Sequence, residues 1–306
     1  MTPDLYHHLS LPIRVDSIGS YPISELTRLT RQRRLFSRLD WWTPVEWYKS
    51  NAFCAASRRE IIEAALLVVP VTLTDMTILQ SSRSTSAWIR WCAISDGFSA
   101  SSVLRPLFDY GENNLQRCGI ERTLCIVEPV HWLYASLRER GYSHQDDVIT
   151  MLSRKSIQLI EKRAAPGSIT IRPATEMDIT WISEVDSQAF EEQWQYPAFV
   201  LRRALGSNAY FTVAEIDGHI VGYQFATCND SDAHITRLAV GRDLQGQGIG
   251  AMLLSDSMIY LRQRLGVNQI TLNTQASNTV SQRLYTRFGF EILQPRLRVM
   301  CRQYRR

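Results

Sequence analysis

The chain has 306 residues, of which 45% are hydrophobic and 21% are charged, and its formal net charge is +4. This is the composition of a globular protein, and the length favours about two domains over one. Lys and Arg residues are interspersed with acidic residues rather than gathered in a basic tract, so we exclude nucleic acid as a partner.

The cysteines and the N-terminal sequence indicate where the protein works. None of the six cysteines belongs to a CxxC pair or has metal-ligand spacing, and most lie in apolar runs. We therefore expect no metal site and a reducing, cytoplasmic environment. Residues 1–15 lack the features of a signal peptide, and no apolar run approaches the roughly 20 residues that span a bilayer. We expect no membrane partner.

A boundary between two domains is predicted at residues 161–168. This stretch is rich in charged and small residues, contains Pro166 and Gly167, and directly precedes an alternating strand pattern. We therefore assign residues 1–165 to a first domain and residues 166–306 to a second.

The second domain is predicted to contain both strands and helices. Asp217 and Gly218 lie between two apolar runs and predict a hairpin turn, and Gly289 suits the left-handed end of a helix. The predicted strands are residues 169–172, 210–216, 219–226, 233–240, 270–272 and 290–293, and the predicted helices are residues 177–190, 252–261 and 279–287.

A weak internal repeat links the two halves of the chain. Four segments of the first half echo four segments of the second half in the same order, at a separation of about 150 residues. Residues 53–56, 61–64, 87–94 and 139–142 correspond to residues 211–214, 220–223, 233–240 and 287–290. Two copies of one fold explain this order. The alternative is that two unrelated domains of mixed α and β structure share apolar strand patterns.

A glycine-rich loop between the strand at residues 233–240 and the next helix predicts an anion site. Its residues are Gln245, Gly246, Gln247, Gly248, Ile249 and Gly250. Backbone amides at the start of a helix, with no side chains in the way, favour a phosphate or pyrophosphate. A dinucleotide fingerprint is disfavoured because the following strand ends at Asn273 without an acid for a ribose, and the Gly-Lys-Ser/Thr of a Walker loop is absent.

These residues resemble the GNAT superfamily of N-acetyltransferases, whose signature is Gln/Arg-x-x-Gly-x-Gly/Ala at the start of a helix. Gln245, Gly248 and Gly250 match that signature, and the resemblance extends through residues 172–174, 237–240 and 278–290. It implies an α+β fold in which tandem domains each have a mixed, mostly antiparallel central sheet flanked by helices. It also implies acetyl-CoA as co-substrate.

The resemblance further implies which residues hold acetyl-CoA. Pantetheine would bond to the backbone of the central strand like an added strand, and the pyrophosphate would lie on amides of the loop. Asn278 matches a position whose side-chain amide contacts the cofactor, and Tyr285 matches a tyrosine placed near the thioester sulfur. The implied set is Leu238, Ala239, Val240, Gln245, Gly246, Gln247, Gly248, Ile249, Gly250, Ala251, Asn278 and Tyr285.

Amine attack on a thioester needs an acid, an oxyanion donor and a base. Tyr285 is the predicted acid, since a phenol stays protonated at neutral pH, although it could simply pack in the core. The amide of Leu238 is the oxyanion donor that the resemblance implies. His234 is the predicted base, because alternation places it on the face of Thr236 and Leu238. A solvent-facing histidine is the alternative, and Glu191 and Glu192 are weaker candidates for the base.

The first domain lacks the residues that this chemistry needs. Its strand ends at Ile94, and the next residues have one glycine, an acidic Asp96 and no Gln-x-x-Gly-x-Gly spacing. Leu137 stands where the second domain has Tyr285, with Tyr134 one turn earlier as a substitute. We predict that residues 1–165 are a degenerate, noncatalytic copy.

The sequence therefore predicts an N-acetyltransferase that transfers an acetyl group from acetyl-CoA to a primary amine by direct attack, through a tetrahedral intermediate. The acceptor would be a small-molecule amine or a peptide N-terminus, and the protein a monomer or a homodimer. The alternative is a noncatalytic module that binds acyl-CoA for regulation.

Overall fold

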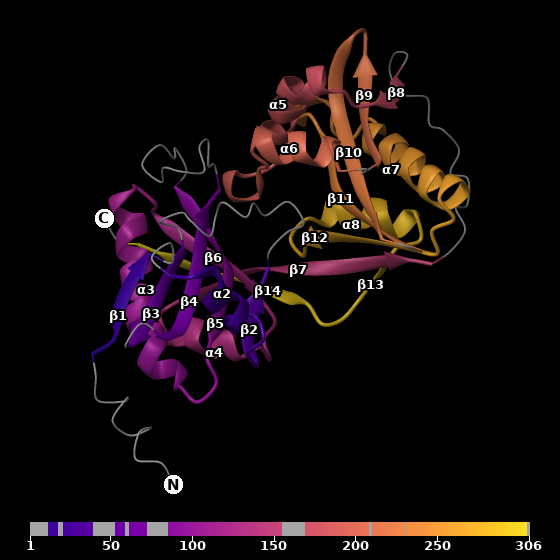
Figure 1. Ribbon diagram of the computed structural model, residues 1–306. Coiled ribbons are helices and arrows are strands. Elements are labelled where there is room, and N and C mark those ends of the chain that lie inside the picture. The colour runs from indigo at the N-terminus through magenta and orange to yellow at the C-terminus, as the bar shows by residue number, and fades with distance from the viewer. Residues whose placement is uncertain are drawn as a thin grey trace. The chain divides into compact units, whose positions relative to one another are not determined.

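The computed structural model describes residues 12–17, 21–38, 53–58, 61–71, 85–154, 169–207, 210–229 and 231–304. Contacts between residues divide the chain into two compact units. Unit 1 comprises Met1–Gln145 and Arg298–Arg306, and unit 2 comprises Asp146–Leu297 (Figure 1). The predicted linker at residues 161–168 lies outside the described residues.

Unit 1 is a sheet covered by helices. Its strands follow the order β1-β3-β4-β5-β6-β14-β7, and β2 pairs with β5. Its elements are β1 (Arg14–Ser17), α2 (Ile23–Leu29), β2 (Arg34–Ser37), β3 (Phe53–Arg58), β4 (Ile61–Pro70), β5 (Ser86–Ile94), α3 (Ala100–Arg117), β6 (Arg122–Val127), α4 (Trp132–Glu139), the start of β7 (Ser143–Ser153) and β14 (Leu297–Gln303).

Unit 2 is also a mixed sheet, with strand order β7-β12-β11-β10-β9-β8 and β13 beside β7. Helices α5 and α6 cover one face of β9 to β11, and α7 covers the other (Figure 1). The elements are β8 (Thr170–Pro173), η4 (Glu176–Asp178), α5 (Ile179–Ala189), η5 (Glu192–Trp194), α6 (Ala198–Leu205), β9 (Tyr210–Ile216), β10 (His219–Asn229), β11 (Asp232–Val240), η6 (Arg242–Leu244), α7 (Ile249–Ile259), the π-helix η7 (Tyr260–Arg264), β12 (Gln269–Gln275), α8 (Thr279–Arg287) and β13 (Glu291–Ile292).

Each unit contains a strand from the other half of the chain. The end of β7 pairs with β12 in unit 2, from Val148 opposite Gln275 to Ser153 opposite Ile270. In return, β14 pairs with β6 in unit 1, and Arg302 donates a 2.7 Å hydrogen bond to the buried Glu112 of α3. The contacts therefore divide the chain differently from the predicted domains 1–165 and 166–306, because β7 and β14 are exchanged.

The internal repeat is confirmed by the order of the elements and by the pairing of the strands. Both central strands carry a bulge at the same place, between Ile89 and Trp91 in β5 and between Ile235 and Arg237 in β11. Ile94 lies opposite Ala64 just as Val240 lies opposite Gly222. The predicted match of residues 61–64 to 220–223 was one residue out of register, because these pairings align residue 64 with residue 222.

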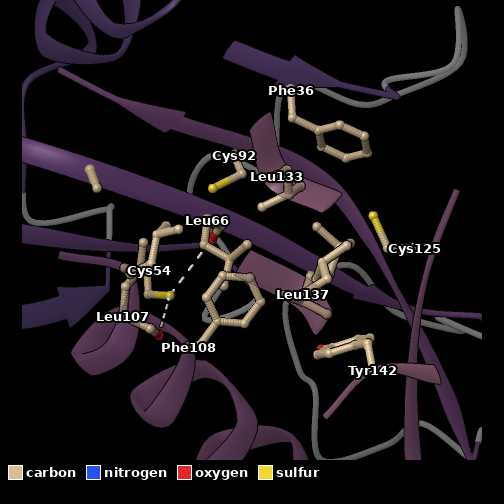
Figure 2. Packing of buried hydrophobic residues seen from close by; sticks show 14 of the residues in the cluster. Phe36, Cys54, Leu66, Cys92, Leu107, Phe108, Cys125, Leu133, Leu137 and Tyr142 are labelled. Carbon is tan, nitrogen blue, oxygen red and sulfur yellow. Dashed lines mark hydrogen bonds between the residues drawn. The ribbon is translucent and has the colours of Figure 1, made fainter. Parts of the chain in front are cut away.

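The residue of unit 1 that corresponds to Tyr285 is Leu137, in the core. Gly141 and Gly289 both follow a helix with positive φ, 84° and 78°, as predicted for Gly289. Counting back from each glycine aligns Leu137 with Tyr285. Leu137 is fully buried and lies among apolar and aromatic side chains, near Leu133 and Tyr142 (Figure 2). Unit 1 therefore has no phenol at this position.

No helix in the described part of the chain is long and apolar enough to cross a membrane.

The strand exchange predicts which fragments fold. A fragment of residues 166–306 lacks β7, and so loses the buried Ile149 and Met151 from its core and leaves β12 with an open edge. Loss of each buried side chain lowers the free energy of unfolding by about 1.5–3 kcal/mol. This is a large part of the stability of a typical domain, which is about 5–15 kcal/mol. We expect this fragment to aggregate and a fragment of residues 146–297 to unfold cooperatively, as measured by size-exclusion chromatography and thermal circular dichroism. Equal behaviour of the two fragments would contradict the exchange.

Candidate active site

The bulge in β11 determines which way its side chains point. Before the bulge, Ala233 and Ile235 pack against α7, in the cluster that includes Leu254 and Met258. After it, Leu238 packs against the same cluster whereas Ala239 packs on the α5 side. One extra residue in the strand has therefore reversed the alternation.

Beyond the bulge, one edge of β11 has no strand partner among the described residues. Strands β11 and β12 pair only from Asp232–Gln269 to Ile235–Leu272, and β12 then continues beside β7. Gly241 donates its amide to Val221 of β10 at 2.9 Å. Because backbone groups alternate between the two edges of a strand, those of Leu238 and Val240 face away from β10. We call these backbone groups the open edge.

The glycine-rich loop leads from this strand into α7. Gly246 and Gly248 have φ values of 80° and 91°, and a Cβ built on either would meet nothing within 4 Å. Met252 is the first amide of α7 with a backbone acceptor, the carbonyl of Gly248 at 3.1 Å. The amides of the first turn and of the loop glycines therefore remain available to an anion beside the helix N-terminus.

Two glutamines hold the loop in place. The side chain of Gln245 donates to the Val240 carbonyl at 3.1 Å, and that of Gln247 donates to the Asp243 carbonyl at 3.4 Å. The amide of Gln245 is itself bonded to the Arg242 carbonyl at 3.3 Å. The set of available amides therefore begins at Gly246, one residue later than predicted.

Gly222 was missed by the sequence analysis, although it brings α7 close to the sheet. A Cβ at this position would lie 2.9 Å from the carbonyl oxygen of Ala239 and 3.1 Å from Leu253 of α7. Real Cβ contacts are not this short, so only glycine permits this spacing. A glycine inside an apolar strand was the available signal.

Tyr285 lies on α8, and Asn278 immediately precedes this helix as its N-cap. The Asn278 side-chain oxygen accepts the Ser281 amide at 3.0 Å and caps the helix, which leaves its NH₂ group as a donor. Tyr285 is 7% exposed and packs against Phe290. Burial raises the pKa of Tyr285 to about 12, while a hydrogen bond with Ser281 and the charge of Arg237 act in the opposite direction. The phenol is therefore protonated at neutral pH.

His234 does not share a face with Leu238, so that prediction was wrong. His234 lies before the bulge and alternates with Ala233 and Ile235, so it is on the side away from α7. The bulge then turns Leu238 to the α7 side. Its Nδ1 lies 2.9 Å from the hydroxyl of Thr271, which itself donates to the Ala233 carbonyl at 3.2 Å. The hydroxyl must then accept from Nδ1–H, which leaves Nε2 as the basic nitrogen. Burial lowers the pKa of His234.

A buried ion pair at the bulge was not predicted. Arg237 contacts Asp186 of α5 through Nη2 at 2.6 Å and Nε at 2.8 Å, and Asp186 is fully buried. Tyr223 donates to the same carboxylate oxygen at 2.5 Å. Burial opposes the charge of Arg237, but Tyr223 and Asp186 outweigh it and raise its pKa. The signal was a charged residue inside the apolar run of β11 and another on the apolar face of α5.

The same pair holds the segment after α5, in which Trp194, Tyr196 and the weaker base candidates lie. The guanidinium of Arg237 lies 3.5 Å from the ring centroid of Phe190 and 4.2 Å from that of Tyr196. It also donates to the Trp194 carbonyl at 2.7 Å, and Asp186 accepts the Tyr196 amide at 2.8 Å. This segment and the bulge are therefore fastened together. Glu191 is exposed and accepts from Gln193 at 2.5 Å.

No group of three or more His, Cys, Asp or Glu side chains in the described part of the chain could hold a metal ion.

Comparisons with known proteins identify the family. The model of the acetyltransferase (GNAT) family matches residues 178–290. An uncharacterised N-acetyltransferase of Methanocaldococcus jannaschii is 31% identical over 120 residues, which are 39% of this chain and 76% of that protein. The chain belongs to the GNAT acetyltransferase family.

Further relatives cover the same region or the whole chain. An N-alpha-acetyltransferase of Sulfurisphaera tokodaii is 29% identical over 133 residues, which are 40% of this chain and 79% of that protein. A tandem GNAT protein from the clavulanic acid biosynthesis pathway has 14% identity and a TM-score of 0.61, and the match covers 95% of this chain and 98% of that one. The fold is thus a tandem GNAT fold, as predicted, and the chain is a member of a family of acetyl-CoA-dependent N-acetyltransferases.

Unit 2 has the features that acetyl-CoA requires. The open edge offers the backbone groups of Leu238 and the amide of Val240 to an extended chain such as pantetheine, while the Val240 carbonyl accepts from Gln245. The loop offers free amides with open space above Gly246 and Gly248. Both belong to the same strand, loop and helix, so the residues of this unit fit the co-substrate of the family.

The ion pair at the bulge predicts a large loss of stability when it is broken. Asp186→Asn leaves the buried Arg237 without its counter-charge, so we expect unit 2 to lose about 3–5 kcal/mol of unfolding free energy in urea titrations. Glu184→Gln is the matched control, since Glu184 is exposed on the same helix and should change stability by less than about 0.5 kcal/mol. If both variants changed the unfolding free energy equally, the ion pair would have no particular role in the stability of unit 2.

Proposed function

We propose that unit 2 transfers an acetyl group from acetyl-CoA to a primary amine by direct attack. The single observation that carries the proposal is the parting of β11 and β12 immediately before the anion loop, which offers an open backbone edge and free amides along one path. In this proposal the open edge holds pantetheine, and the amides of Gly246 to Ala251 hold the pyrophosphate, with the Asn278 NH₂ group as a further donor.

The residues of the chain supply the three roles of the reaction. The amine nitrogen attacks the thioester carbonyl carbon, and the Leu238 amide donates to the oxygen that becomes negative. His234 takes a proton from the amine through Nε2, directly or through water. The tetrahedral intermediate then collapses, the C–S bond breaks, and Tyr285 gives its phenolic proton to the leaving sulfur. Tyr285 regains a proton from solvent and His234 releases the one that it took, which restores both groups.

The acceptor amine approaches from the face of the sheet away from α7. Ile235 and Leu238 pack against the cluster of α7 on one face, while His234 and the segment fastened by Arg237 lie on the other. A small-molecule amine and a peptide N-terminus both satisfy this arrangement.

A noncatalytic acyl-CoA-binding module is the second candidate. It is distinguished by measuring thiol release from acetyl-CoA in the presence of a panel of amines that includes small amines and short peptides. The proposal expects release that depends on an amine. Binding of acetyl-CoA without release for any amine would favour the module.

Tyr285→Phe tests the acid. Removing the phenolic proton should lower kcat by about 10²–10⁴-fold while the KM for acetyl-CoA stays within about twofold, because the ring still packs against Phe290. Tyr134→Phe in unit 1 is the control and should leave kcat unchanged. If Tyr285→Phe retained full kcat, Tyr285 would have no role as the acid.

The pH dependence of kcat/KM on the acid side tests His234 as the base. A base acts only when deprotonated, and burial lowers the pKa of His234 below the ordinary value of 6.5. The fall in kcat/KM that His234 causes should therefore lie below pH 6.5, separate from the fall that protonation of the acceptor amine causes at higher pH. His234→Gln should lower kcat/KM and remove the fall that His234 causes. Tyr285, with its pKa raised to about 12, should cause no loss between about pH 7 and 10. An unchanged acid limb in His234→Gln would assign the base to another group.

A further inference from the structure

In unit 1, a segment of the chain itself occupies the counterpart of the open edge. Strand β5 pairs with β6 only from Ser86 to Trp88, so β5 leaves β6 as β11 leaves β12. The part of β5 that does not pair with β6 pairs instead with β2 in the antiparallel direction. Phe36 lies opposite Cys92, and Arg34 lies opposite Ile94. We call residues 32–37, which include β2, the strap.

The strap uses the backbone groups that correspond to the open edge of unit 2. Ser95 donates its amide to Glu63 of β4 at 2.7 Å, so odd-numbered residues of β5 face β4. Arg38 donates its amide to the Arg90 carbonyl at 2.7 Å, so even-numbered residues face the strap. The shared bulge aligns Cys92 with Leu238 and Ile94 with Val240.

The strap also closes the loop that follows β5. The Gln32 side chain accepts the Asp96 amide at 2.8 Å. The Arg34 guanidinium donates to the carbonyl oxygens of Ser95, at 3.3 Å, and of Phe98. The loop therefore turns carbonyl groups toward a cation, where the loop of unit 2 turns amides outward. Its charge preference is the reverse of a phosphate site.

The strap is also built into the core of unit 1. Phe36 is 3% exposed and belongs to the cluster that contains Cys92, Leu133 and Leu137 (Figure 2). Its ring meets that of His131 edge-on at 5.5 Å. Displacing the strap would expose this buried aromatic side chain to water and would also break the strand pairing.

We propose that the strap is a built-in substitute for the cofactor in unit 1. Its backbone takes the place of pantetheine on Cys92 and Ile94, and Gln32 and Arg34 take the place of the pyrophosphate at the loop. Unit 1 is then permanently closed to acyl-CoA, and each chain binds one molecule of it, at unit 2. The count of one rests on the proposed function of unit 2, whereas the closure of unit 1 does not.

Hydrogen–deuterium exchange of the full chain, with and without acetyl-CoA, tests the closure. Without ligand, the amides of Cys92 and Ile94 should exchange slowly and those of Leu238 and Val240 quickly. At 100 times Kd, acetyl-CoA should slow exchange at Leu238 and Val240 by up to about 100-fold and change Cys92 and Ile94 by less than about twofold. Fast exchange at Cys92 and Ile94 without ligand, or protection there by acetyl-CoA, would overturn the proposal.

Counting the bound molecules separates this proposal from the function proposed for unit 2. Gly248→Asp places a carboxylate at the anion loop and should abolish binding, while Gly218→Asp, in the β9–β10 turn with a similar φ of 80°, should leave it unchanged. We expect wild type to bind one equivalent in calorimetric titration. Binding of a second equivalent of acetyl-CoA by wild type would overturn the closure. So would binding of one equivalent by Gly248→Asp, if acetyl-CoA also slowed amide exchange at Cys92 in that variant. No binding in wild type would reject the function of unit 2, while slow exchange at Cys92 would still support the strap.

Discussion

The arrangement of unit 2 depends on one extra residue in β11. The bulge between Ile235 and Arg237 reverses the direction of the side chains that follow. It directs Arg237 toward α5, where Asp186 compensates its charge, and turns Leu238 toward α7. The strand also loses its pairing with β12 at this point. One extra residue thus decides which side chains of β11 face α7 and which face α5 and the segment that follows it.

The ion pair explains how an irregular strand can be held rigid. A bulge removes regular pairing, and a buried guanidinium is costly unless it is fully bonded. Here Arg237 meets a carboxylate, a carbonyl and two aromatic rings, and these partners come from α5 and the segment that follows it. The bulge, α5 and the segment after α5 therefore pack together around Arg237. This packing holds the neighbouring Leu238 amide in a fixed direction.

The two units share one scaffold but differ in what covers its central strand. Both keep the bulge, the parting of two parallel strands and the helix that ends at a glycine with positive φ. They differ in what lies against the central strand and in the helix position of Tyr285 and Leu137. In unit 1, Leu137 and the strap are part of the core. In unit 2, the phenol of Tyr285 takes the position of Leu137, and the central strand keeps the open edge where the strap lies in unit 1. The exchange of β7 and β14 makes the sheet of each unit depend on the other half of the chain.

The sequence by itself determined the features that are encoded within a few residues. The hairpin at Asp217 and Gly218, the loop at Gly246 and Gly248, helix α8 and the internal repeat follow from turn chemistry, glycine spacing and apolar periodicity. Only the tertiary structure decided the face of His234, the pairing of Asp186 with Arg237, the exchange of two strands and the position of the strap. A bulge shifts the alternation without any signature in the residues around it, and strand partners far apart in the chain are chosen by packing and by open edges. The physical reason is that these choices depend on contacts between distant residues, whose energies are not written in any local pattern.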